Sequence, residues 1–108
     1  MITDKEYELV TEFGTYKIKL ETGNYRNNGS LAIEMYSWDE DSEYYEPFET
    51  LTTNLLYASV PADETSAYVD TDGYVDLLGF IRDNGIGEIT DITEQSGFNT
   101  YVLVYFDI

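Results

Sequence analysis

Negative charge is the feature that most limits how this chain can fold. The 108 residues include 22 Asp and Glu against five Lys and Arg, which gives a formal net charge of −17. Residues 27–81 contain twelve acids and no base. Self-repulsion of this size destabilises a compact state, and solubility needs a net charge of only about 2–8 in a small domain. The excess therefore suggests a functional acidic surface, and an ordinary solvated surface is the simpler alternative.

The rest of the composition indicates a single packed domain, residues 1–108. Aromatic residues make up 16% of the chain and include eleven Tyr, whereas disordered acidic segments are poor in aromatics. Apolar runs are far too short to span a membrane, and residues 1–6 lack the apolar core of a signal peptide. We expect a cytoplasmic protein with no membrane partner.

Alternating apolar and polar residues predict several strands. Residues 13–21 and 31–38 both alternate, and the Asn-Asn-Gly at 27–29 suits a tight reversal, so these segments predict a hairpin. Residues 44–56 predict a third strand, with Pro47 at a sheet edge or a bulge because proline donates no ladder hydrogen bond. Residues 67–69 predict a short strand, and residues 101–106, apolar on both faces, a central one.

One helix is expected in the second half. Asp72 resembles an N-cap, Tyr74, Leu77, Leu78 and Ile81 follow at helical spacing, and the Asn-Gly at 84–85 is a helix stop. Residues 1–12 are expected to be a loose or helical lead-in and residues 87–97 an irregular connection. The sum is an α+β domain in which an antiparallel sheet of about 4–5 strands packs on one helix.

Several kinds of chemistry are excluded or unsupported. The chain has no His and no Cys, so the usual catalytic triads cannot form, and we expect no enzyme and no cofactor. The spacing Asp39-x-Asp41-x-Glu43 resembles a calcium loop, but Tyr44 stands where the turn needs Gly. No specific metal site is predicted, although a divalent-cation binder remains an alternative function.

The charge distribution argues against direct nucleic-acid binding, which needs clustered Lys and Arg, but favours a partner that binds nucleic acid. Carboxylates two residues apart on a strand lie about 6.6 Å apart, close to the phosphate spacing of a duplex strand. A basic channel would attract such an array. Aromatics between the acids would act as anchors, or serve only in cross-strand packing. The predicted partner-binding residues are Glu34, Asp39, Glu40, Asp41, Glu43, Glu46 and Glu49, with Tyr36, Trp38, Tyr44 and Tyr45.

A family resemblance supports this setting. The chain resembles a family of short acidic domains of unknown function encoded by phages and mobile elements of gut bacteria. Six segments carry the resemblance in order, namely 16–20, 23–25 with 29–34, 46–55, 67–72, 84–87 and 96–101. Two of them depart from the family pattern, at 70–73 and at Asn99, which argues against a fixed chemical site there.

The resemblance implies an accessory protein, and small acidic phage proteins often inhibit host defence nucleases. We therefore expect an acidic nucleic-acid mimic that inhibits a basic host protein, such as a CRISPR-Cas effector or a restriction enzyme, as a monomer or a homodimer in the cytoplasm of the bacterial host. A protein-interaction module with an unrelated partner is the main alternative.

Overall fold

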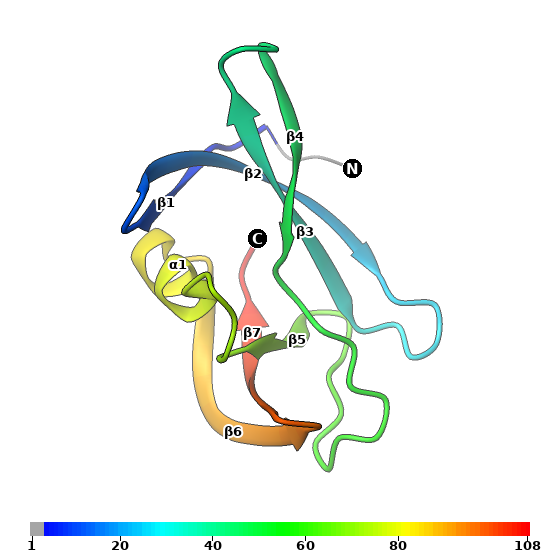
Figure 1. Cartoon of the computed structure of the whole chain (residues 1–108). Coiled ribbons are helices and arrows are strands. Elements are labelled where there is room, and N and C mark those ends of the chain that lie inside the picture. Colours follow the sequence, from blue (N-terminus) through cyan, green and yellow to red (C-terminus); the bar gives the residue numbers. More distant parts are fainter. Residues whose placement is uncertain (1–3) are drawn as a thin grey trace.

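The computed structural model describes residues 4–108 and contains two antiparallel sheets and one helix within that range (Figure 1). The larger sheet is a meander in the order β1-β2-β3-β4, and the smaller has the order β5-β7-β6. The strands of the larger sheet are β1 (Tyr7–Thr11), β2 (Gly14–Asn24), β3 (Leu31–Asp39) and β4 (Tyr44–Thr50). The other elements are β5 (Ser66–Asp70), α1 (Leu77–Asn84), β6 (Gly87–Ser96) and β7 (Asn99–Phe106). The α+β class is confirmed, with the strands divided between two sheets rather than joined in one.

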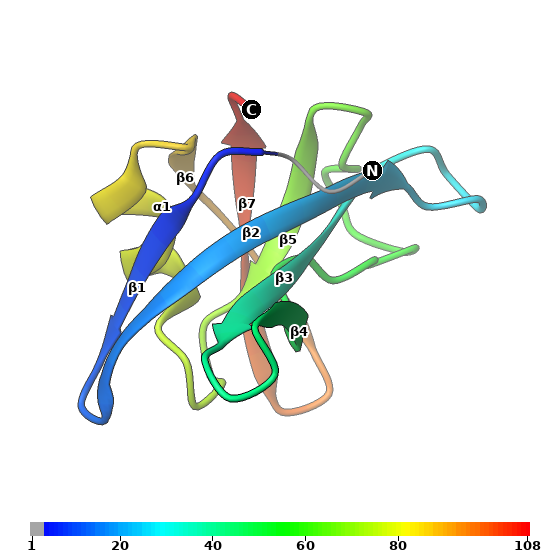
Figure 2. The same cartoon turned by 90° about the horizontal axis from the view of Figure 1, so that it is seen from above.

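The core lies where the larger sheet packs over the smaller sheet and α1 (Figure 2). The alternation read from the sequence sets which face points inward, because successive side chains of a strand point to opposite faces. On β2 and β3 the inward residues Ile18, Leu20, Ile33 and Met35 are completely buried. They pack with Val69 and Val104 of the smaller sheet and with Phe80 and Ile81 of the helix.

The smaller sheet is covered on its other face by the segment between β4 and β5. Thr53 forms an isolated bridge with Tyr68 of β5, and the Tyr68 hydroxyl donates to the backbone oxygen of Val60 at 2.5 Å. Tyr68 and its cross-strand partner Leu103 are fully buried. β7 is therefore a central strand buried on both faces, as its sequence predicted.

The helix begins later than expected. Asp76, not Asp72, is the N-cap, and its carboxylate accepts from the Gly79 N–H at 2.9 Å. The carboxylate of Asp72 instead accepts from the Thr100 N–H at 2.6 Å, and Tyr74 lies fully exposed ahead of the helix. The predicted stop is confirmed, because Gly85 ends the helix in the left-handed region with φ 61°.

Two strands of the structure were not predicted from the sequence, and one strand is shorter than predicted. Within the predicted lead-in 1–12, of which residues 1–3 lie outside the described part, Tyr7–Thr11 forms β1. The expected irregular segment 87–97 is mostly β6, where a register shift between Ile89 and Thr93 breaks the two-residue period. The strand expected over 44–56 ends at Thr50. Pro47 does lie on an edge strand at a register irregularity, as predicted.

Candidate protein-interaction surface

The β3–β4 hairpin projects from the body of the molecule and carries the acids predicted to bind a partner (Figure 1). Residues 31–50 include seven acids and no base. The pairing divides these acids between two faces. Glu34 points to the outer face of the sheet, together with Tyr36 and Trp38, whereas Glu46 pairs with the inward residue Ser37. Glu49, which lies beyond a register irregularity, lines a shallow hollow together with Glu34. The strands therefore do not present one flat carboxylate array.

The acids do converge at the tip of the hairpin. The carboxylate of Asp39 accepts from the Asp41 N–H at 3.0 Å and from the Ser42 hydroxyl. The Ser42 hydroxyl, followed by the Asp41 N–H, lowers the pKa of Asp39. Asp39 is thus occupied in shaping the turn, whereas the side chains of Glu40, Asp41 and Glu43 are exposed to solvent.

Glu43 has an unusual backbone conformation for its residue type. Its φ is 58°, and it is the single non-glycine residue among 4–108 with a positive φ. This left-handed conformation is favoured by Gly and, among the other residues, by Asn and Asp. The turn therefore holds a glutamate where its backbone favours a smaller residue.

The outer face of the sheet combines aromatic rings with a lysine that sequence reasoning did not place there. Trp38 and Tyr45 form an edge-on pair with ring centroids 5.2 Å apart. The Nζ of Lys19 lies 4.9 Å from the centre of the Tyr45 ring, a cation–π distance. Burial, then the nearby Glu6 carboxylate, raises the pKa of Tyr45. The signal was available in the sequence, since Lys19 follows the outward period of β2.

The other predicted residues of this face have local partners. Tyr36 donates to the Glu21 carboxylate at 3.0 Å, and this hydrogen bond is the main cause of its raised pKa. Glu34 lies directly opposite Glu21 across β2 and β3, and its carboxylate accepts from the Thr50 hydroxyl at 3.1 Å. Tyr44, at the start of β4, is exposed. The outer face is thus a mixed polar and aromatic surface, less acidic than the hairpin tip.

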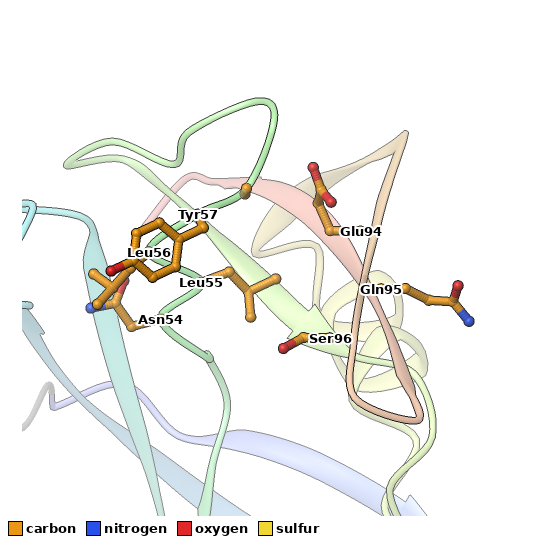
Figure 3. Close-up of a pocket in the computed structure, with 8 residues that line it drawn as sticks. Asn54, Leu55, Leu56, Tyr57, Glu94, Gln95 and Ser96 are labelled. Carbon is orange, nitrogen blue, oxygen red and sulfur yellow. The ribbon is translucent and has the colours of Figure 1, made fainter.

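A separate pocket lies between the segment after β4 and the end of β6 (Figure 3). It measures about 300 Å³ and is lined by residues 54–58 and 94–96. Leu55 points towards β6, whereas Gln95 points away from the pocket (Figure 3). The Glu94 carboxylate accepts from the Ser59 N–H at 2.5 Å, so this acid ties the segment to the sheet. Among residues 4–108, no three acidic side chains are grouped so as to hold a metal ion.

These features define a small acidic α+β domain with an exposed hairpin. Residues 19–108 match the family model described as Domain of unknown function (DUF4313), and the chain belongs to that family. The match begins within β2, so β1 and the turn that follows it lie outside the matched region. Comparison with the curated proteins and with the solved structures found no match. No helix in the described part of the chain is long and apolar enough to cross a membrane.

Proposed function

We propose that this protein is a phage or mobile-element accessory protein that acts in the host cytoplasm by binding, not by catalysis. Its β3–β4 hairpin occupies the nucleic-acid channel of a basic host defence protein, such as a CRISPR-Cas effector or a restriction enzyme. The observation that carries this proposal is the projection of a base-free hairpin with seven acids from a domain of net charge −17.

The shape and charge of the hairpin suit this role. Defence effectors hold nucleic acid in positively charged channels, and a narrow two-stranded projection can enter a channel that a flat surface cannot. Opposite fields accelerate the encounter and orient it. The exposed acids at the tip, Glu40, Asp41 and Glu43, would meet the channel first.

The conformation of Glu43 gives independent support. A left-handed residue other than Gly costs roughly 1–2 kcal/mol, so this position is less stable than it would be with Gly. Strained residues cluster at functional sites because function, rather than stability, selects them. A carboxylate retained at a turn position that favours Gly or Asn fits a binding role for that charge.

Charge reversal at the tip tests the proposal. Asp39 shapes the turn and is left intact, and Glu40, Asp41 and Glu43 are each changed to Lys. The matched control reverses Asp83, Glu88 and Asp91, which are also exposed but lie on α1 and β6. Both triple variants shift the net charge by the same amount, so they differ only in where the charge lies.

The assay is recovery of nucleic-acid-binding defence proteins from host lysate in low and high salt, followed by displacement with duplex DNA. The tip variant should lose recovery, and the control should keep it. High salt and added DNA should each weaken the wild-type interaction. Equal recovery by both variants, or a partner that DNA does not displace, would refute nucleic-acid mimicry.

A partner unrelated to nucleic acid is the second candidate, and the outer face of the larger sheet favours it. Trp38, Tyr45 and Lys19 form a compact aromatic and cationic cluster there, and aromatic residues dominate binding hot spots. Under this alternative, Trp38→Ala would abolish binding that the tip variant retains.

A further inference from the structure

We propose that an apolar groove beside the hairpin binds an apolar side chain from a basic segment of the partner protein. The groove measures about 470 Å³ and lies between the β1–β2 turn, β4 and the segment that precedes α1. Its apolar lining is formed by Val10, Phe13, Tyr16, Phe48, Tyr74 and Val75. The inference rests on the proposed function, because it assigns the groove to the same partner.

The lining is unusually exposed for residues of this kind. Phe13 is 83% exposed and Val10 is 68% exposed, and Tyr74 is fully exposed. Tyr16 and Phe48 are half-buried, with ring centroids 5.6 Å apart. A contiguous apolar patch, unlike a single exposed side chain, is typical of an interaction site. This groove therefore combines exposed aromatic walls with partly buried rings.

The surrounding charge selects the occupant. Glu12 and Asp76 line the groove itself. Phe48 also lines an adjoining shallow hollow along β4, where Glu34 and Glu49 lie. An apolar side chain entering the groove would bring its chain neighbours against these carboxylates, so neighbours that are Lys or Arg complement the site. A second copy would set one charge of −17 against another, and an anionic membrane would be repelled for the same reason.

The groove and the hairpin then have different kinetic roles. Exposed charges change mainly the association rate and its salt dependence, whereas desolvated apolar anchors change mainly the dissociation rate. The acidic tip would capture the basic partner, and the groove would hold it. Because Phe48 belongs to β4, the strand that completes the hairpin, one partner segment could engage both features.

Two synthetic peptides of equal charge test the groove directly. One has a central Leu-Trp pair between two Lys-Lys pairs, and the other replaces the central pair with Ser-Gly. Binding is followed by backbone amide NMR shifts during titration. The Leu-Trp peptide should bind about tenfold more tightly than the Ser-Gly peptide, as expected of a buried aromatic anchor, and should shift the amides of Phe13, Tyr74 and Val75.

Matched variants distinguish binding in the groove from nonspecific binding to exposed aromatic rings. Phe13→Ser with Tyr74→Ser removes two exposed walls of the groove, and Phe98→Ser with Tyr57→Ser removes two equally exposed rings elsewhere. The first pair should abolish the preference for the Leu-Trp peptide and leave Ser-Gly binding unchanged. The second pair should change neither. Circular dichroism melting is the control for folding, and both double variants should keep a cooperative transition.

The outcomes also distinguish this inference from the proposed function. If the Phe13 and Tyr74 variant still prefers the Leu-Trp peptide, the groove is not the anchor site, whatever the hairpin does. If charge reversal at the tip does not weaken binding of the partner, but the preference for the Leu-Trp peptide persists, the mimicry proposal fails. The groove then remains a site for a basic peptide. If the wild-type protein sediments as a dimer and the Phe13 and Tyr74 variant as a monomer, the groove binds a second copy and the inference is overturned.

Discussion

The left-handed conformation of Glu43 gives a prediction in which stability and binding change in opposite directions. Replacing Glu43 by Gly removes the clash between Cβ and the backbone that makes φ 58° unfavourable. The left-handed conformation costs an L-residue roughly 1–2 kcal/mol. The greater conformational entropy of Gly in the unfolded chain offsets about 0.5–1 kcal/mol of this gain. The free energy of unfolding should therefore rise by about 0.5–1 kcal/mol.

Two companion variants separate the backbone effect from the charge effect. Glu43→Gln removes the charge and keeps the strain, and Glu43→Asn removes the charge and places a residue that tolerates the left-handed region. The order of stability should be Gly and Asn above Gln. Urea unfolding followed by Trp38 fluorescence measures this well, because Trp38 packs on Tyr45 close to the tip. In thermal melts the gain should be roughly 2–5 °C for a domain of this size.

The binding prediction uses the same three variants. Each should weaken the salt-sensitive interaction with the basic partner to a similar extent, since each removes the same charge. A Gly variant no more stable than the Gln variant would refute the strain argument. Unchanged binding in all three would show that the strained carboxylate does not serve the interaction.

Three further predictions concern the fold. Tyr68→Phe should lower the free energy of unfolding by about 0.5–1.5 kcal/mol, measured by urea unfolding, because it removes the hydrogen bond to the carbonyl of the exposed residue Val60; an unchanged midpoint would contradict the role given to this contact. A Gly→Ala substitution such as Gly79→Ala normally stabilises a helix by about 1 kcal/mol. Here it should fail to stabilise the protein, because the new Cβ would overlap the Asp76 carboxylate. In an Asp76→Ala background the same substitution should stabilise the protein, so additive effects in that double-mutant cycle would refute the overlap. The Thr65 N–H, then the Ser66 and Thr65 hydroxyls, lower the pKa of Asp63 below its ordinary 3.8, so its contribution to stability is present above that pH and is lost as pH falls through the lower folded value. Asp63→Asn should therefore flatten acid unfolding in that window, and an identical acid profile would count against the assigned hydrogen bonds.

Local pattern was sufficient for β2 and β3, which each have one buried and one more solvated face. Ile18, Leu20, Ile33 and Met35 could be assigned to the core from their two-residue period, and all four are fully buried. Gly85 could be read as a helix stop, since few other residues adopt its φ of 61°. The same reasoning missed β1 and β6. The first is short, and a register shift interrupts the period of the second.

The candidate site shows the same division between sequence and tertiary structure. The sequence alone determined the charge and its concentration in residues 31–50, because these depend only on residue type and on position along the chain. Only the tertiary structure decided that Glu34 faces away from Glu46, that Lys19 joins Tyr45, and that Phe13, Phe48 and Tyr74 meet in one groove. The physical reason is that pleat and register are set by pairing between strands, and a groove is set by the packing of segments distant in sequence.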